Sequence, residues 1–279
     1  MIKLGAHISI AKSLDLAVDR AQNLACDYLQ IFPCSPLSWR PFSYPDNIIG
    51  KFNHKISKSN INSVFIHGIY LVNLGSNNQE LINNSIQSLS DSLSLQAKIS
   101  ARGVVIHPGS AVNNNKDDSV ESIVAIAKKM LAKNIVYKII FESSAGAGET
   151  IGSSLEDLAI IDKAINLPNQ TSFCLDTCHM YSSGIDITDI TNFERKINST
   201  IGFNRIDAIH LNDSESKFNS KRDRHADIGK GEIGIDNLKK MIGLQGLTNI
   251  PLILETPILK DINQDKPSGE IINIKKSLS

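Results

Sequence analysis

Two kinds of side chain that bind metal ions, imidazole and carboxylate, recur in this chain at the ends of short apolar runs. The residues that close these runs are His67, His107, Glu142, Asp176, His210 and Glu255. Three further residues of the same kinds lie in the motifs Asp176-Thr177-Cys178-His179 and Asp223-Arg224-His225. Zinc takes three or four such protein ligands, with water in the open position of a catalytic site. Nine donors exceed the needs of one ion and fit two or three ions that share a bridging carboxylate.

The spacing of these donors indicates how they share ions. Glu142 is the natural bridge, and hence the candidate catalytic carboxylate, because its run lies between two others that end in donors. His179 lies one helical turn beyond Asp176. The i, i+2 spacing of Asp223 and His225 puts both side chains on one side of an extended segment. Metal ions close together can clamp a phosphate, ionise a water and stabilise a leaving oxygen. The cluster therefore predicts phosphodiester hydrolysis.

A structural interpretation competes with this one at every position. A single histidine that closes a strand is more often a hydrogen-bonded structural residue than a ligand. We assign His7 to a structural or supporting role, and we expect His54, in a polar helical stretch, to be solvated. Glu142 and Glu255, each taken alone, could cap or bridge barrel loops. A purely structural role would have to hold at all six strand ends and both motifs at once, which is improbable. The nine residues together therefore strongly indicate a metal centre, although no single residue does.

Eight apolar runs, most of which end in these donors, are typical of strands buried on both faces of a parallel sheet. They cover residues 3–7, 28–32, 62–67, 104–107, 139–142, 173–176, 207–210 and 251–255. The later runs end about 35 to 45 residues apart, and a βα unit needs about 30 residues or more. The pattern predicts the α/β class and one (β/α)8 TIM barrel domain over residues 1–279. The metal cluster is then expected at the C-terminal face of the strands, where barrel enzymes gather catalytic residues.

Helical patterns and one long loop fill the intervals between the runs. Ser13 is the expected N-cap of a helix whose apolar residues recur three or four apart, and Ser154 precedes another. Ile271 and Ile272 belong to a short apolar pattern that predicts the last barrel helix. Residues 212–234 lack apolar periodicity, and a loop of this length that carries two metal-type side chains is expected to be functional.

Composition and charge narrow the classes of function. Hydrophobic residues make up 41% and charged residues 21% of the chain, which is ordinary for a globular domain. The formal net charge of zero argues against a general polyanion-binding surface and leaves a local groove open. The sequence has neither a signal-peptide pattern nor a run of transmembrane length, so we expect a cytoplasmic enzyme without a membrane partner. The cysteines, Cys26, Cys34, Cys174 and Cys178, are expected to be reduced thiols.

At these residues the sequence resembles the endonuclease IV family of abasic-site DNA repair enzymes over nearly the whole chain. The motifs that carry the resemblance are Leu4-Gly5-Ala6-His7, His107-Pro108-Gly109-Ser110, Leu175-Asp176-Thr177-Cys178-His179, His210-Leu211-Asn212-Asp213, Asp223-Arg224-His225 and Leu252-Ile253-Leu254-Glu255-Thr256. The resemblance implies three zinc ions per chain. The first ion would be held by His67, His107 and Glu142, the second by Glu142, Asp176, His210 and Glu255, and the third by His179, Asp223 and His225.

The resemblance also implies a reaction. A hydroxide between the first two ions would attack the phosphate 5′ to an abasic site in double-stranded DNA, and the third ion would stabilise the departing 3′-oxygen. The products would be a 3′-hydroxyl and a 5′-deoxyribose phosphate. The same chemistry would remove blocking groups from 3′ ends. We expect the enzyme to be a monomer.

DNA-binding residues follow from the same resemblance. Tyr70 and Leu71 match a wedge that enters the minor groove and fills the gap at the lesion, and apolar wedges are known to kink DNA. Without the resemblance, these two residues indicate a packed loop. In the loop after the second run, Trp39 and Arg40 match the family, but Leu37 stands where the family has a groove-inserting arginine. This loop therefore offers DNA one cationic contact fewer than the family pattern.

Two functions of other kinds remain as alternatives. Sugar isomerases on related barrels also gather histidine and carboxylate side chains at strand ends. They typically use two divalent ions with mostly carboxylate ligands, whereas this set is rich in histidine. A non-catalytic DNA-damage binding protein with structural zinc is the other alternative, and the presence of all nine ligands argues against it.

Overall fold

A closed barrel of eight parallel strands forms the centre of the molecule. The computed structural model describes residues 2–40 and 42–279. The barrel strands are β1 (Leu4–His7), β2 (Tyr28–Ile31), β3 (Ser63–His67), β4 (Val104–Ile106), β6 (Ile139–Glu142), β8 (Thr171–Asp176), β9 (Ile206–His210) and β12 (Leu252–Leu254). They neighbour one another in this order, and β1 closes the barrel on β12, with Leu4 opposite Leu252. The (β/α)8 TIM barrel predicted from the apolar runs is thus confirmed.

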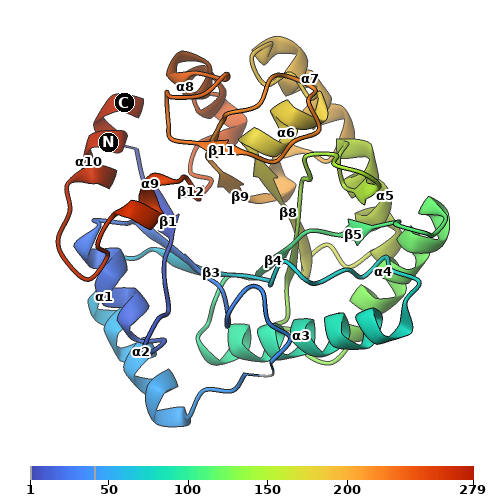
Figure 1. Ribbon diagram of the computed structural model, residues 1–279, viewed down its shortest axis with the longest axis horizontal. Coiled ribbons are helices and arrows are strands. Elements are labelled where there is room, and N and C mark those ends of the chain that lie inside the picture. Colours follow the sequence, from blue (N-terminus) through green and yellow to red (C-terminus); the bar gives the residue numbers. More distant parts are fainter. Residues whose placement is uncertain (1, 41) are drawn as a thin grey trace.

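Helices surround this barrel (Figure 1). The longer ones are α1 (Leu16–Asn23), α2 (Asp46–Lys58), α3 (Gln79–Lys98), α4 (Lys116–Leu131), α5 (Leu155–Ile165), α7 (Ile190–Thr200), α8 (Ile235–Ile242) and α10 (Glu270–Leu278). Shorter elements lie in the loops between the barrel strands and the longer helices. The helical ones are α6 (Thr177–Ser183), α9 (Ile258–Asp261) and the 3-10 turns η1 (Phe203–Arg205) and η2 (Gln245–Leu247). Two antiparallel strand pairs are β5 (Gly109–Ser110) with β7 (Thr150–Ile151), and β10 (Asp213–Ser214) with β11 (His225–Ala226). Within the described ranges, no helix combines the length and apolarity needed to cross a bilayer.

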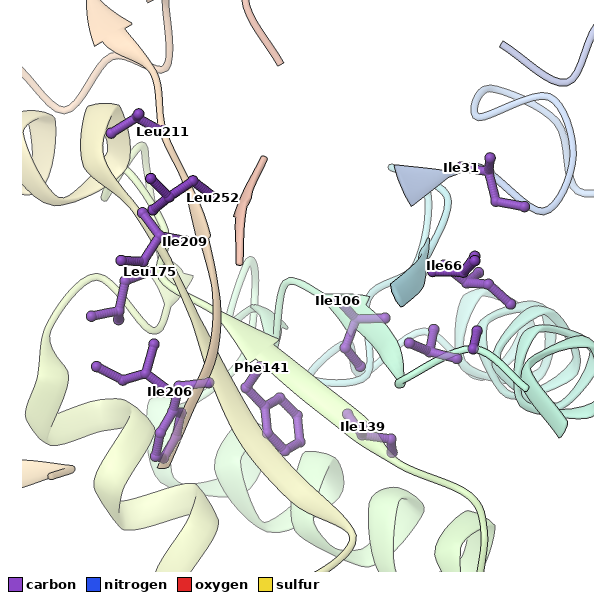
Figure 2. Close-up of a cluster of buried hydrophobic side chains, with 14 of the residues drawn as sticks. Ile31, Ile66, Ile106, Ile139, Phe141, Leu175, Ile206, Ile209, Leu211 and Leu252 are labelled. Atoms are coloured by element: carbon purple, nitrogen blue, oxygen red, sulfur yellow. The ribbon is translucent and has the colours of Figure 1, made fainter. Parts of the chain in front are cut away.

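Apolar side chains on the outer faces of the strands pack against these helices. Figure 2 shows several of them, among them Ile66, Ile106 and Phe141, all of which are buried. Each fully buried side chain of this size contributes about 1.5–3 kcal/mol by leaving water. This packing fixes the strands, and with them every side chain that extends from the strand ends.

A second, smaller apolar cluster fills the inside of the barrel. Its members are Tyr28, Phe65, Val105, Ile140, Cys174, Ala208 and Ile253, one from each of seven strands. The eighth strand contributes Gly5, where a Cβ atom would lie 2.4 Å from the carbonyl oxygen of Tyr28, so only glycine leaves room for that neighbour. Because side chains two positions apart share a face of a strand, this layer is a floor beneath the residues at the strand ends.

Several local predictions can be compared with the structure. The last barrel helix is confirmed as α10. The helix expected after Ser154 is α5, and Ser154 is its N-cap because its hydroxyl accepts from the N–H of Asp157 at 3.1 Å. The N-cap prediction at Ser13 is wrong. Its hydroxyl donates to the carboxylate of Asp15, and α1 begins after Asp15. All four cysteines are free thiols, as expected.

Candidate metal centre

Eight polar side chains, one from each barrel strand, form a ring directly above the inner apolar floor. They are His7, Gln30, His67, His107, Glu142, Asp176, His210 and Glu255. Each follows a floor residue, or Gly5, by two positions, as Glu142 follows Ile140, so the strand pleat points all eight into the barrel. The side chains of Glu142, Asp176 and His210 are essentially inaccessible to solvent. The ring contains the six metal-ligand candidates predicted at strand ends.

Glu142 lies at the centre of this ring. Its Oε2 is 3.0 Å from Nε2 of His67 and 3.5 Å from Nε2 of His107. Its Oε1 is 2.8 Å from Nδ1 of His210 and 3.4 Å from Nδ1 of His179. One carboxylate therefore faces two histidines with each oxygen. This is the arrangement expected of a carboxylate that bridges two ions.

The residues of a second cluster come from α6 and the β10–β11 loop. The carboxylate of Asp176 accepts from the backbone N–H of His179 at 2.8 Å, which caps α6 and turns His179 toward the centre. Nε2 of His179 and Nε2 of His225 lie 3.2 and 3.4 Å from Oδ1 of Asp223, and 3.4 Å from each other. The predicted long loop thus contains a short antiparallel pair, which brings Asp223 and His225 to the barrel strands.

The hydrogen bonds of these histidines indicate a site suited to a cation. Nδ1 of His179 donates to the carbonyl of Ser143 at 2.9 Å, and Nδ1 of His225 lies 3.3 Å from the carbonyl of Glu255. In the neutral imidazoles Nε2 then carries a lone pair. The two Nε2 lone pairs and Oδ1 of Asp223 lie within 3.4 Å of one another. These electron-rich atoms repel one another unless a positive charge lies between them.

The donor separations fit zinc. Bond lengths of about 2.0–2.1 Å in tetrahedral geometry place donor atoms about 3.3 Å apart, close to the separations in the cluster of His179, Asp223 and His225. Ligand atoms also lie within 4.8 Å of one another in two further sets. These sets are His67, His107 and Glu142, and Glu142, Asp176, His210 and Glu255. The structure therefore brings all nine predicted donors together in three groups.

Ionisation in the centre follows from burial and close opposite charges. Burial favours the neutral form of Glu142, but the charges of His107 and His210 and hydrogen bonds from the histidines hold its pKa well below the usual range. Partial desolvation opposes ionisation of Asp223, whose side chain is 54% exposed, yet the hydrogen bond and charge of His179 lower the pKa of Asp223 to about 2. Burial lowers the pKa of His210, but the neighbouring Cys174, Glu255 and Glu142 raise it well above its ordinary value. In the metal-free protein, protons provide the positive charge in this centre.

Supporting residues that the sequence patterns did not identify lie around the ligands. Asn212, which is fully buried, donates to Oδ2 of Asp176 at 2.6 Å and accepts from the N–H of Glu255 at 2.9 Å. Asp213, also buried, accepts from the backbone N–H groups of Gly231 at 3.1 Å and Ile233 at 3.0 Å, which orders the segment after β11. Both residues follow His210 in one motif. Two polar residues directly after a strand end were the feature of the sequence that could have indicated their supporting role.

The predicted DNA-binding residues differ in their solvent exposure. Leu37 and Tyr70 are 74% and 61% exposed, unusual values for large hydrophobic side chains. The Tyr70 ring lies 5.1 Å from that of Phe32 and 6.2 Å from that of His67, which puts it beside the metal centre. Arg40 is exposed, whereas Leu71 and Trp39 are partly buried against the core. A cavity of about 810 Å³ opens here, lined by Tyr70 among others.

Comparisons with known proteins agree with this geometry. Residues 18–274 match the xylose isomerase-like TIM barrel family. A probable endonuclease 4 of Persephonella marina is 35% identical over 94% of this chain and 93% of its own length. Apurinic-apyrimidinic endonuclease 1 of Saccharomyces cerevisiae is 32% identical over 93% of this chain and 72% of its own. The crystal structure of endonuclease IV from Thermus thermophilus superposes with a TM-score of 0.86, at 31% identity and 99% coverage of both chains.

Proposed function

The chain belongs to the endonuclease IV family of xylose isomerase-like TIM barrels, and we propose that it is a zinc-dependent deoxyribonuclease that repairs abasic sites. It hydrolyses the phosphodiester 5′ to an abasic site in double-stranded DNA and leaves a 3′-hydroxyl and a 5′-deoxyribose phosphate. The same chemistry gives it a 3′-repair diesterase activity. One observation carries the proposal: nine histidine and carboxylate side chains converge in one centre at the end of the barrel, and the donor atoms of His179, Asp223 and His225 lie at separations that fit zinc.

We assign the donors to three zinc ions. His67, His107 and Glu142 hold the first ion; Glu142, Asp176, His210 and Glu255 hold the second; His179, Asp223 and His225 hold the third. When bound, the ions supply Lewis-acid stabilisation of the phosphate and a low pKa for a coordinated water. All nine donors come from one chain, which supports a monomeric enzyme. The cytoplasmic location expected from the sequence stays a prediction.

The side chains themselves supply orientation. His67 donates from Nδ1 to the carbonyl of Gly68 at 2.7 Å, which leaves Nε2 free to face Glu142. His179 uses Nδ1 in the same way on Ser143. Because outer hydrogen bonds of this kind fix the tautomer and ring plane of a ligating histidine, the centre is ordered before substrate arrives. The buried floor below keeps bulk water out from that side.

The sugar isomerase alternative shares the barrel but not the donor set. The family description alone includes both kinds of enzyme, so the fold does not discriminate between them. The five histidines, and the Asp223–His225 cluster that the β10–β11 loop adds beyond the strand ends, favour phosphodiester chemistry over a centre of mostly carboxylate ligands. The other alternative, a non-catalytic protein with structural zinc, does not require an open cavity beside its metal site. The cavity of about 810 Å³ next to this centre therefore favours an enzyme.

A duplex with one tetrahydrofuran residue tests the proposed function. Hydrolysis needs no C1′ aldehyde, so we expect this reduced abasic analogue to be cut on its 5′ side, with a 3′ end that a polymerase extends. The undamaged duplex is the control. Trapping of the protein on natural abasic DNA by borohydride, together with failure to cut tetrahydrofuran, would show a Schiff-base lyase instead and exclude this mechanism.

Tyr70 is proposed to fill the gap left by the missing base. A stacked aromatic side chain contributes about 1–3 kcal/mol by alanine substitution, so Tyr70→Ala should raise KM on abasic duplex about tenfold or more. Tyr70→Phe keeps the ring and should stay near wild type. The effect should be smaller on single-stranded abasic DNA, which has no stack to hold open. Equal losses on both substrates would mean that Tyr70 only packs its loop.

A further inference from the structure

Gln30 is a buried amide inside the ring of metal ligands that the ligand assignment does not use. Its side chain is fully inaccessible to solvent. Oε1 lies 2.9 Å from Nε2 of His210, and Nε2 lies 2.6 Å from Oε1 of Glu255. The amide thus connects a histidine and a carboxylate that both belong to the proposed second zinc site.

The orientation of this amide is fixed by its neighbours. An ionised carboxylate only accepts hydrogen bonds, so the group 2.6 Å from Glu255 must be the NH2 of Gln30. The opposite orientation would put a carbonyl oxygen against a carboxylate oxygen at that distance. The carbonyl of Gln30 therefore faces His210, and Nε2 of His210 must carry a proton to donate to it.

The protonated Nε2 determines what the other nitrogen of His210 can do. Nδ1 lies 2.8 Å from Oε1 of Glu142, 3.4 Å from Oε2 of Glu255 and 4.0 Å from Oδ2 of Asp176. These are the other donors of the second site. When a metal ion takes the place of the proton on Nδ1, the ring would keep its proton on Nε2 and present the Nδ1 lone pair to the ion, in the tautomer that a metal ion requires.

Gln30 orders Glu255 in the same way. Oε1 of Glu255 accepts from Gln30 and lies 3.2 Å from Nδ1 of His7, while Oε2 faces His210. Nε2 of Gln30 is also 3.1 Å from Nδ1 of His7. One oxygen of the carboxylate is therefore held by the barrel, and the other is left for the metal centre. His7 has the supporting role that was expected for it.

We propose that Gln30 is a positioning residue of the second metal site, which selects the Nδ1-ligating tautomer of His210 and aims one oxygen of Glu255. The proposal rests on the proposed zinc centre. Loss of such an outer partner typically lowers metal affinity 10–100-fold. Gln30 touches neither of the other two proposed sites directly, so the loss should concern one ion of three.

The test compares Gln30→Leu with Gln170→Leu. Gln170 is a second buried glutamine, and its amide donates only to backbone carbonyls, such as that of Asn134 at 2.9 Å, away from the metal ligands. Zinc loss is followed by competition with a chromophoric chelator at constant pH. We expect Gln30→Leu to release one ion per chain 10–100-fold more readily than wild type, and Gln170→Leu to release all ions as wild type does. Three equally tight ions in Gln30→Leu would overturn the proposal.

Two further measurements test the proposal if Gln30→Leu fails to fold. Gln30→Glu keeps an acceptor for His210 but puts a carboxylate against Glu255, and it should also weaken one ion. In the zinc-loaded wild-type protein, nitrogen-15 NMR of the histidines should show His210 protonated at Nε2 alone, and protonation at Nδ1 instead would overturn the proposal without any variant. If wild-type protein held fewer than three ions, the zinc assignment would fail instead, so the two failures are distinguishable.

Discussion

Glu142→Gln is expected to reduce turnover by at least 10²–10³-fold, the typical cost of losing one transition-state stabiliser. The carboxylate is buried and faces four histidines with its two oxygens. A glutamine keeps the shape but removes the charge, and it turns an NH2 group toward one pair of histidine nitrogens. The proposed first and second ions would then lose their shared ligand. Single-turnover cleavage of tetrahydrofuran duplex measures the loss.

DNA binding should survive the same substitution, because Glu142 is fully buried and offers DNA no direct contact. The Kd for abasic duplex should stay within a few-fold of wild type. Glu215→Gln, which removes the same charge from an exposed position of the β10–β11 loop, is the matched control and should retain activity. More than a tenth of wild-type turnover in Glu142→Gln, in protein that has bound its metal, would contradict a bridging role.

Removal of the metal ions is expected to cause the second large loss of activity. Lewis-acid stabilisation is worth several kcal/mol, and each 1.36 kcal/mol is tenfold in rate, so a chelator should lower activity by about 10³-fold or more. Zinc should restore it, whereas magnesium should not. Activity that persists after complete removal of zinc would exclude the mechanism.

Metal removal should also change how stability depends on pH. In the metal-free protein the pKa of His210 is raised by Cys174, Glu255 and Glu142 against the effect of burial. This contribution is present below the unfolded pKa of about 6.5 and is lost as pH rises through the higher folded pKa. Ions displace these protons, so metal binding strengthens as pH rises. The difference in Tm between zinc-loaded and metal-free protein should therefore grow from about pH 5.5 to about pH 8. A constant difference would show that the histidines are not the ligands.

The apolar runs of the sequence were sufficient to predict the barrel and the six polar side chains at its strand ends that are candidate ligands. A run such as Ile139-Ile140-Phe141-Glu142 has to be buried on both faces, and a polar residue at its end therefore points to the catalytic face of a barrel. Because eight such runs repeat the same geometry, errors of one residue in their limits did not change which side chains meet. The six strand-end donors converge for this reason.

Residues that act through a tertiary partner could not be found this way. Gln30 follows Tyr28 by two positions, as the strand-end donors follow their own floor residues, but an amide alone carries no metal signal, and its partners are far along the chain. Ser13 failed as an N-cap for a related reason, since a nearby carboxylate competes for its hydroxyl. The β10–β11 pair joins residues too far apart for local patterns to indicate.

The number of zinc ions that restores activity distinguishes a three-ion centre from a simpler one. Metal-free protein is titrated with zinc, and bound zinc per chain is measured by elemental analysis beside the rate on tetrahydrofuran duplex. We predict that full activity returns at three ions per chain, and that His225→Ala, which removes a ligand of the third site, binds two ions tightly and stays nearly inactive. Full activity at one ion or fewer per chain would contradict the three-ion centre.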